Sequence, residues 1–418
     1  MELLIRHGLI VTQDAARRVI EGDVMVEDGL ITSVGKGGSG SDHVIDAEGG
    51  IVMPGLFNTH THVGMTDLRG LLDDMNLEPF LEKTFRLDNG RTSGEIQSAS
   101  IHAIHEMLAG GTTSFADLYY SEDVIAEACG QTGIRGFLAW VTLDREITTQ
   151  KGDPVKNADD FCKRFSKPGL VTPMVGLQGV YVCSEETAMA AKSVAHRRGR
   201  GMHMHLCETR HEVYSHEART GRRPVDWLSS IGFLDGSAPL LAAHGAWLTR
   251  NEMKTLHAAG VSVSSCARSN MKLGSGIPPV EELRSEGVTV SLGTDSATTS
   301  NNLDMFEEMR TASLLQKVNK WDASVLPASG VLDMVTRNAA GSLGVLGTLG
   351  SIEEGKKADI ILLDRRSARL FPLGKENVIQ QIVYSAQSSD VTHTIVDGRQ
   401  VYSRGGSEGA PWNGMTPS

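Results

Sequence analysis

The sequence predicts an α/β fold: a (β/α)8 TIM barrel accompanied by a small β-sandwich domain built from both termini. Eight short apolar runs alternate with helix-length segments through the middle of the chain. Polar residues that could carry chemistry lie at the ends of several of these runs. The first fifty and the last seventy residues instead show the pattern of short strands separated by Gly and Asp turns.

The two ends of the chain predict one composite β domain. Near the C-terminus, Asp397-Gly398 separates two apolar runs, which is a strong hairpin signal. Neither end has enough strands to bury a face alone, so we expect the two ends to pair with one another. The expected boundaries are 1–52 and 350–418 for this domain and 53–349 for the barrel.

The eight central runs are strand candidates because each is short and apolar. They are Ile51–Phe57, Thr112–Ala116, Gly136–Val141, Met174–Val182, Gly201–Leu206, Pro239–Ala243, Val261–Ser264 and Val288–Leu292. Helix candidates between and after them include Ser93–Ala109, Glu185–Arg198, Thr249–Ala259 and Leu303–Lys317. Eight such units form either a closed barrel or a doubly wound sheet.

The placement of polar residues distinguishes these two arrangements. Residues at or just beyond the carboxyl end of a run are His60, His62, Asp117, His205, His244 and Asp295. In a barrel those ends converge on one mouth. A doubly wound sheet would not gather residues from its first, fifth, sixth and eighth units at one point. The barrel is therefore expected, with a site at its mouth.

Composition favours a small-molecule partner. The net charge is −11 and no Lys/Arg-rich block stands out, so we expect neither nucleic acid nor an anionic membrane as partner. Five widely spaced cysteines without a Cys-x-x-Cys pair fit a reducing compartment, and the cytoplasm is expected. No signal peptide is recognisable, and no apolar run approaches the roughly 18 residues of a membrane span.

The metal-binding hypothesis begins with His60-Thr61-His62 at the end of the first run. Side chains on a strand repeat with a period of two, so both imidazoles face the same side. Such a pair suits zinc or a similar divalent ion, whereas calcium and magnesium prefer oxygen ligands. His205 offers a third imidazole, and Asp295 can be a fourth ligand.

Around these residues the chain resembles the amidohydrolase superfamily, in its branch of methylthioadenosine/S-adenosylhomocysteine deaminases and related chlorohydrolases. The resemblance covers nearly the whole chain. Its most specific segments are Pro54–His62, Gly110–Thr113, His203–Thr209, Ala243-His244, Ser269–Leu273, Gly293–Asp295 and Gly350–Asp359. A cytidine-deaminase fold is disfavoured because its His-x-Glu and Pro-Cys-x-x-Cys signature is absent.

The resemblance implies one divalent ion bound by His60, His62, His205 and Asp295. Zinc is expected, with ferrous iron as the alternative. A second ion would need a bridging lysine at the end of the fourth strand, and Met174–Cys183 contains none. His203 is expected to be a barrel-interior group.

The resemblance also implies a reaction and three catalytic residues. Asp295 would help to deprotonate the attacking water, and His244 would polarise or orient it. Glu208 would protonate a ring nitrogen of an aromatic heterocycle, a task that suits a carboxyl group with a raised pKa. Ammonia would then leave. Asp117 is expected to be structural, with support of a metal ligand as the alternative.

Three positions depart from the family pattern and concern the substrate. Gln178 stands where the relatives carry a histidine, and Trp140 stands where they carry an arginine. Asp88 aligns near the position at which the relatives carry a glutamate that holds ribose hydroxyls. A Trp offers a flat stacking surface in place of a cation. The altered set favours a planar, less anionic substrate such as a nucleobase, a nucleoside or a related ring.

The leading hypothesis is therefore a metal-dependent hydrolytic deaminase of an aromatic N-heterocycle, of the EC 3.5.4 type, in nucleoside or nucleobase metabolism. The alternative keeps the same site in a chlorohydrolase or a hydrolase of cyclic amides or N-alkylamines. A catalytically inactive barrel would be expected to lack a metal ligand, and none is missing. The resemblance implies a homo-oligomer.

Overall fold

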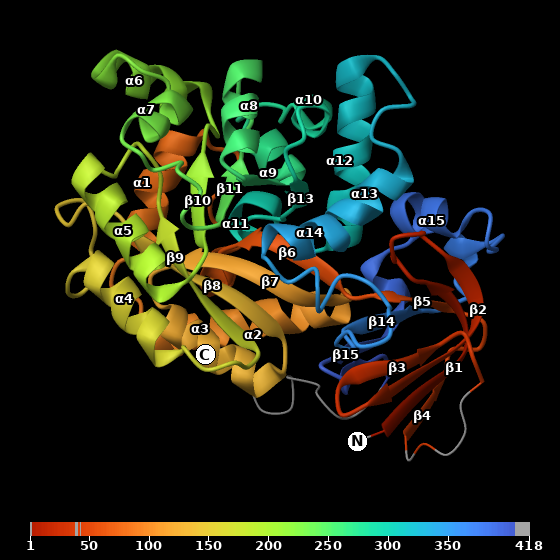
Figure 1. Cartoon of the computed structure of the whole chain (residues 1–418). Coiled ribbons are helices and arrows are strands. Elements are labelled where there is room, and N and C mark those ends of the chain that lie inside the picture. The colour runs from red at the N-terminus through yellow and green to blue at the C-terminus, as the bar shows by residue number, and fades with distance from the viewer. Residues whose placement is uncertain (1, 38–40, 42, 406–418) are drawn as a thin grey trace.

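The computed structural model describes residues 2–37, 41 and 43–405. A central barrel lies beside a second sheet (Figure 1). The last part of the expected terminal domain, residues 406–418, lies outside the described residues. None of the helices in the described part of the chain combines the length and apolar character that crossing a membrane requires.

The barrel consists of eight parallel strands in chain order, which confirms the predicted fold class. First and last strands meet where the Asp295 N–H donates to the His60 carbonyl at 2.9 Å. The strands are β6 (Leu56–Thr61), β7 (Thr112–Tyr119), β8 (Arg135–Thr142), β9 (Val171–Leu177), β10 (Met202–Leu206), β11 (Leu240–His244), β12 (Ser262–Ser265) and β13 (Val290–Leu292).

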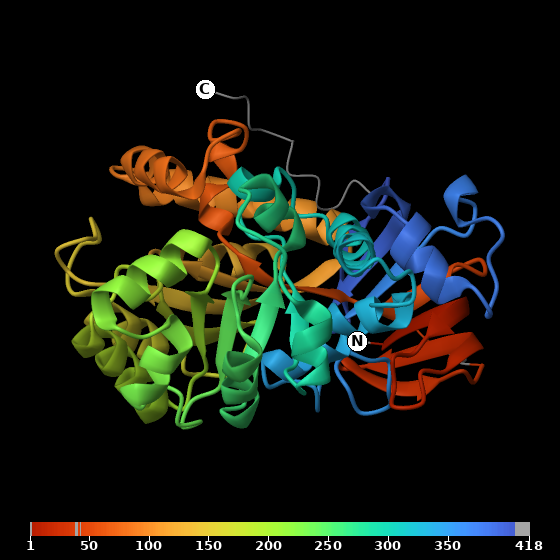
Figure 2. The ribbon, with the colours of Figure 1, turned by 90° about the horizontal axis from the view of Figure 1, so that it is seen from above.

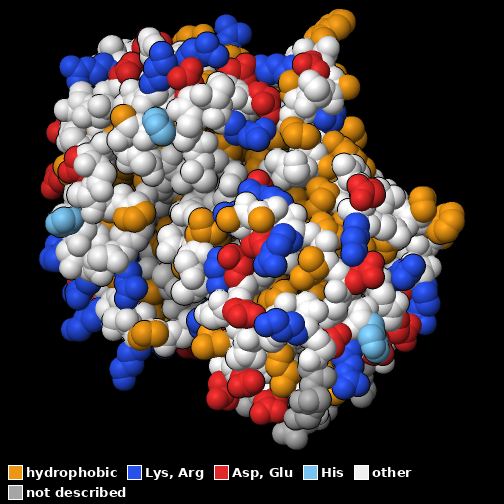
Figure 3. All heavy atoms as spheres, turned by 45° about the vertical axis from the view of Figure 1, so that its right-hand side comes forward, with side chains coloured by type: hydrophobic (Ala, Val, Ile, Leu, Met, Phe, Trp, Pro, Cys, Tyr) orange, Lys and Arg blue, Asp and Glu red, His pale blue; other side chains and the backbone are white. Residues whose placement is uncertain are grey.

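Helices surround the barrel (Figures 1 and 2). They are α2 (Ser93–Ala109), α3 (Glu122–Thr132), α4 (Pro154–Arg164), α5 (Glu185–Arg198), α6 (Arg210–Thr220), α7 (Pro224–Ser230), α8 (Arg250–Ala258), α10 (Val280–Ser285), α12 (Met305–Lys320), α13 (Ala328–Met334) and α14 (Arg337–Ser342). The expected bounds of α2 and α5 are observed, because the N-caps Thr92 and Ser184 each accept a backbone N–H of the first turn. On the face shown in Figure 3, acidic and basic side chains are interspersed.

Both ends of the chain contribute to one mixed sheet beside the barrel. Its N-terminal strands are β1 (Glu2–Val11), β2 (Val19–Glu27), β3 (Leu30–Val34), β4 (His43–Asp46) and β5 (Ile51–Pro54), and its C-terminal strands are β14 (Ile360–Leu363), β15 (Val391–Val396) and β16 (Arg399–Ser403). Strand β14 pairs with β5 and so joins the two ends. The hairpin at Asp397-Gly398 connects β15 to β16, as expected.

The first apolar run, expected as one strand, divides at Gly55 between the two sheets. A side chain there would begin 2.1 Å from the Thr113 hydroxyl oxygen of β7, so only glycine fits this crossing. We propose that the first boundary between the terminal domain and the barrel, expected after residue 52, lies at Gly55. We propose that the second boundary lies at residue 350. The fourth run is also shorter than expected, because β9 ends at Leu177 and residues 178–182 form a turn at the rim.

Hydroxyl groups bind the closing strands to one another inside the barrel. The Thr59 hydroxyl lies 2.7 Å from that of Ser264 and 2.9 Å from that of Ser291. It also donates to the Leu292 carbonyl at 2.8 Å. These bonds hold β6 in register beside β12 and β13, directly before the His60-Thr61-His62 segment.

Candidate active site

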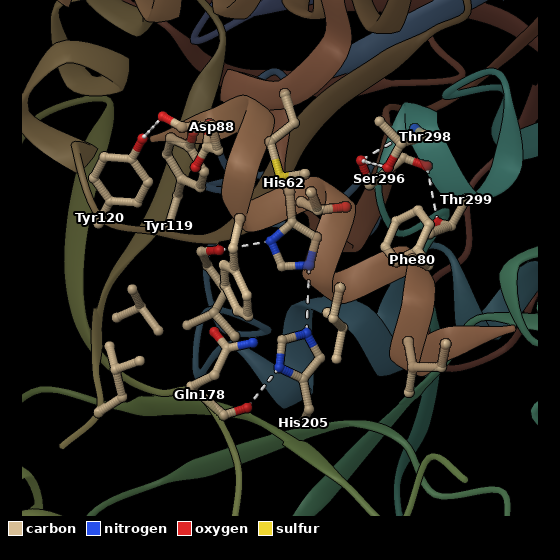
Figure 4. A pocket seen from close by; sticks show the side chains of 18 of the residues that line it. His62, Phe80, Asp88, Tyr119, Tyr120, Gln178, His205, Ser296, Thr298 and Thr299 are labelled. Carbon is tan, nitrogen blue, oxygen red and sulfur yellow. Dashed lines mark hydrogen bonds between the residues drawn. The ribbon is translucent and has the colours of Figure 1, made fainter. Parts of the chain in front are cut away.

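The four predicted metal ligands converge at the carboxyl ends of their strands. Asp295 Oδ1 lies 3.5 Å from His60 Nε2 and 3.2 Å from His62 Nε2. The Nε2 atoms of His62 and His205 are 3.3 Å apart (Figure 4). The ligand atoms of His60, His205 and His244 also lie within 4.8 Å of one another, so His244 borders the same point.

The second nitrogens of the imidazoles are occupied. His62 Nδ1 donates to the Leu118 carbonyl at 2.6 Å, and His205 Nδ1 donates to the Gln178 carbonyl at 2.7 Å. Because a carbonyl only accepts, each neutral ring keeps its lone pair on Nε2. Burial lowers the pKa values of His60 and His205 well below the usual range. His60 Nε2 is buried without a hydrogen-bond partner in the described chain. These converging lone pairs beside a carboxylate fit a divalent cation.

The Asp295 carboxylate is fixed from two sides. The Ser269 hydroxyl donates to Oδ2 at 2.6 Å, and the Ser296 N–H donates to Oδ1 at 2.7 Å. Burial alone would raise its pKa, but the close approach of the imidazoles of His62, His60 and His244 holds that pKa well below its usual range. His203 is buried inside the barrel, as expected, with Nε2 3.0 Å from the Nδ1 of His60.

Glu208 and His244 lie beside this cluster. Glu208 Oε2 is 3.7 Å from His244 Nε2, and Glu208 Oε1 accepts the Ser275 hydroxyl at 3.3 Å. Burial raises the pKa of Glu208, which favours the protonated form that a general acid requires. His244 Nδ1 donates to Asn270 Oδ1 at 2.9 Å, which leaves Nε2 as an acceptor.

A cavity opens above these groups, and Figure 4 shows part of its lining. One wall is the apolar face of α1 (Leu77–Asp88), which contributes Leu77, Phe80, Leu81 and Phe85. The loop between β8 and α4 contributes residues 147–150. None of the described residues that line the cavity is a lysine or an arginine.

Two of the three expected substrate residues line this cavity. Gln178 borders it from the turn after β9, and its Nε2 donates to the Tyr181 hydroxyl at 3.1 Å. Asp88 ends α1, where its Oδ1 accepts the Tyr119 hydroxyl at 2.5 Å and Arg91 Nη1 at 3.1 Å. These two hydrogen bonds fix the Asp88 carboxylate at the edge of the cavity.

Trp140 does not line the cavity, so the expected stacking on its ring is corrected. The neighbouring strand position, Val141, lines the cavity, and alternation along β8 turns Trp140 to the other face. There its ring packs against Phe161 of α4 with centroids 5.8 Å apart. Its Nε1 donates to Gln150 Oε1 at 3.0 Å, so it contacts a cavity residue without lining the cavity.

Asp117 braces the strand that carries the histidine pair. It is fully buried and accepts the Thr61 hydroxyl at 2.6 Å and the Val63 N–H at 2.8 Å. Burial raises its pKa to about 6. These two contacts agree with the structural role expected for Asp117. They hold the residues immediately before and after His62.

Several residues of the site were not identified from the sequence. The most important are on α1, although the spacing of Leu77, Phe80, Leu81 and Phe85 is helical and could have revealed it. After the seventh strand lies α9 (Ala267–Lys272), from which Ser269 and Asn270 hold Asp295 and His244. Nothing in the sequence around Ser269 or Asn270 predicts these two contacts.

Comparison with known proteins agrees with this architecture. Residues 51–401 match the family model described as Amidohydrolase family. A 5'-deoxyadenosine deaminase of Methanosarcina barkeri is 39% identical over 403 residues, covering 95% of this chain and 92% of the relative. A 5-methylthioadenosine/S-adenosylhomocysteine deaminase of Thermodesulfovibrio yellowstonii is 37% identical over 94% of this chain and 92% of its own length.

Solved structures show the same fold. An adenosine deaminase from Xanthomonas campestris with bound zinc has a TM-score of 0.91 and 30% identity, covering 95% of this chain and 92% of that chain. An atrazine chlorohydrolase from Arthrobacter aurescens, complexed with zinc, has a TM-score of 0.86 at 24% identity, covering 95% and 94% of the two chains. The second likeness concerns the fold alone.

The chain belongs to the amidohydrolase family. It is a hydrolase acting on carbon–nitrogen bonds other than peptide bonds, and the predicted deaminase function is confirmed at this level.

Proposed function

We propose that the chain is a deaminase of a neutral adenine nucleoside whose 5' position carries hydrogen or a small apolar substituent. The observation that carries the proposal is the cavity, in which Glu208 and the histidine cluster face an apolar wall without a lysine or arginine among its described lining residues. The names of the relatives, deaminases of 5'-deoxyadenosine and of methylthioadenosine or S-adenosylhomocysteine, support the adenine ring.

We assign His60, His62, His205 and Asp295 as the ligands of one divalent cation. The buried, unpartnered His60 Nε2 and the occupied Nδ1 atoms of the other two imidazoles support this assignment. Zinc is proposed because it prefers such nitrogen-rich sets, with ferrous iron as the alternative. When bound, the cation supplies a Lewis acid that makes water a nucleophile near neutral pH.

Each remaining group has one proposed task. Asp295, fixed by the Ser269 hydroxyl on Oδ2, accepts a proton from the attacking water. His244 orients that water through Nε2, since Nδ1 donates to Asn270. Glu208 donates its proton to the ring nitrogen beside the carbon under attack. The amino group then takes the proton held by Asp295 and leaves as ammonia, and the proton of the added hydroxyl passes to Glu208 as the oxo group forms.

The substrate side of the cavity distinguishes polar from apolar parts of the ligand. We assign Asp88 to the sugar hydroxyls, because it is a carboxylate, an acceptor-only group, among the residues that line the cavity. Gln178 offers an amide that can meet a ring edge. On the α1 side the lining residues Phe80 and Leu81 are apolar. None of the described lining residues is a lysine or an arginine that could pair with a substrate carboxylate.

The test is ammonia release by the zinc-loaded chain from 5'-deoxyadenosine, 5'-methylthioadenosine, S-adenosylhomocysteine, adenine and guanine. We expect kcat/KM for the first two to exceed that for S-adenosylhomocysteine by about 10- to 100-fold, because burying its charged amino-acid end without a partner is costly. A preference for S-adenosylhomocysteine, or for a free base, would contradict the proposed substrate. Chloride release from a chlorotriazine without ammonia release from any nucleoside would favour the chlorohydrolase alternative.

The acid role of Glu208 has its own variant. Glu208→Gln keeps the size of the side chain but cannot donate an acidic proton, so kcat should fall by about 10²- to 10⁴-fold. Metal content, measured by elemental analysis, should stay the same because the ligands are intact. Unchanged turnover would exclude this role.

The cellular setting and the oligomeric state are separate proposals. We propose a cytoplasmic enzyme because all five cysteines are free and buried, as is usual in a reducing compartment. A homo-oligomer is proposed from the family resemblance. Sedimentation of the purified chain would test the oligomer directly.

A further inference from the structure

We propose that Glu212 is a positioning residue for the reaction, acting through Glu208 by holding the backbone turn that carries it. The inference rests on the proposed acid role of Glu208. It comes from a comparison of three helix starts with the same Thr-x-x-Glu sequence, at Thr92, Thr209 and Thr249.

Two of these helix starts form an ordinary capping box. In α2 the Thr92 N–H donates to Glu95 at 2.7 Å, and in α8 the Thr249 N–H donates to Glu252 at 2.7 Å. Each threonine hydroxyl accepts the N–H of its glutamate in return. In this arrangement the glutamate accepts the N–H of the N-cap residue of its own helix. Glu252 also accepts Arg223 Nε and Nη2, each at 3.0 Å, but neither glutamate holds the backbone before its N-cap.

The third helix start, at α6, uses the same motif differently. The Thr209 hydroxyl accepts the Glu212 N–H at 3.1 Å, as in the other two. The Glu212 carboxylate, however, reaches back past Thr209. Its Oε1 accepts the Cys207 N–H at 2.9 Å, and its Oε2 accepts the Glu208 N–H at 2.7 Å. Both oxygens therefore hold the turn between β10 and α6.

The backbone of this turn has an unfavourable conformation that hydrogen bonds from outside the turn stabilise. Cys207 has a φ of 52°, a left-handed conformation that is unfavourable for a residue with a side chain. Its carbonyl accepts the Trp247 N–H at 3.0 Å, so the peptide is fixed from a second side. Because Glu208 follows Cys207 directly, the direction of its side chain toward His244 and Ser275 depends on this backbone.

Glu212 is suited to the task because a carboxylate is acceptor-only at both oxygens. Glutamine in its place would keep one acceptor and turn an NH2 group toward the other N–H. The two donors could then not both be satisfied, and the turn should shift. A displacement of about 1 Å at the reacting group can cost about 10²-fold in rate.

The experiment compares Glu212→Gln with Glu208→Gln and with Glu252→Gln in the zinc-loaded chain. Glu252 is the control, because it is buried, occupies the same helix position and completes the ordinary capping box. Its variant also loses the ion pair with Arg223, so it tests whether a larger loss of buried contacts lowers kcat by itself. We expect Glu212→Gln to lower kcat by about 10- to 100-fold with KM and metal content unchanged. Glu252→Gln should lower the melting temperature to at least a similar extent without lowering kcat.

A binding measurement separates positioning from general loosening. A nucleoside analogue with a tetrahedral ring carbon and an N–H facing Glu208 should bind Glu212→Gln and Glu208→Gln more weakly than the parent. A nucleoside in which that ring nitrogen is replaced by CH offers Glu208 no hydrogen bond and should bind all of them equally. If Glu212→Gln does not fold, Glu212→Asp is measured instead, since its shorter carboxylate cannot span both N–H groups.

The outcomes distinguish the two hypotheses. If Glu208→Gln loses turnover and the Glu212 variants do not, the positioning role is overturned and the acid role stands. If Glu208→Gln keeps its turnover, the acid role fails and the inference with it. An equal loss of kcat in Glu252→Gln would also overturn the positioning role.

Discussion

The cavity has two walls of different origin. The chemical wall, defined by His60, His62, His205, His244 and Asp295, is made of residues at the ends of barrel strands. The recognition wall is made of α1, the β8–α4 loop and the turn after β9, none of which is a strand. Strand ends are fixed by the barrel register, whereas loops and added helices are placed only by packing.

This difference explains the pattern of correct and incorrect expectations. On the chemical wall, the ligands predicted from motifs converge within a few ångströms. On the recognition wall, Trp140 faces away from the cavity and α1 was not expected. Each prediction below tests whether the two walls are as separable in function as they are in structure.

The largest effect is expected from Asp295→Asn on the chemical wall. The amide can serve neither as the charged ligand nor as the proton acceptor, the two roles proposed for Asp295, so kcat/KM should fall by on the order of 10³- to 10⁵-fold. Metal content, measured by elemental analysis, should fall with it, in contrast to Glu208→Gln. Full metal content with wild-type turnover would show that Asp295 is neither a metal ligand nor the proton acceptor.

A smaller effect, confined to binding, is expected from Asp88→Asn on the recognition wall. Loss of the charged acceptor should raise KM for a ribonucleoside by about 10- to 100-fold while kcat changes little. Steady-state kinetics with a 2',3'-dideoxynucleoside supplies the control, because a substrate without the hydroxyls should not distinguish variant from parent. An equal loss on both substrates would place Asp88 elsewhere in the mechanism.

The support behind the chemical wall should show a pH signature in stability. Glu308 is buried and accepts the Ala267 N–H at 2.6 Å, at the start of α9. Burial raises its pKa from an ordinary value near 4.5 to about 8. Between these values the unfolded chain binds fewer protons than the folded one, so this group makes stability fall as pH rises from about 4.5 to about 8.

Glu308→Gln should remove that contribution. Denaturant unfolding of parent and variant at several pH values should show a difference that moves in favour of the variant as pH rises and levels off above about 8. A difference that is constant with pH would mean that Glu308 does not titrate with the raised pKa.

The smallest effect is expected from Trp140→Phe. The ring would remain against Phe161, and only the hydrogen bond to Gln150 would be lost. One such bond is worth about 1 kcal/mol, so KM should change by no more than about 5-fold. A change in KM as large as that of Asp88→Asn would show that Trp140 contacts the substrate after all.

Much of the molecule follows from local sequence. The bounds of α2 and α5 were predictable because Thr92 and Ser184 are good N-caps with acidic first turns. The hairpin at Asp397-Gly398 followed from turn chemistry. The division of the first run at Gly55 could not be predicted, because its cause is the Thr113 side chain on another strand.

The sequence by itself determined the barrel, because strand-end periodicity is a property of neighbouring residues, and it indicated the reaction class through the resemblance of its motifs to a known family. Only the tertiary structure decided which groups support them: Asn270 beneath His244, Ser269 beneath Asp295, and Glu212 behind Glu208. It also decided that α1 covers the cavity and that Trp140 does not enter it. Such contacts depend on where separate elements pack, and an identical Thr-x-x-Glu motif acquires a different partner at Thr209 than at Thr92 for that reason.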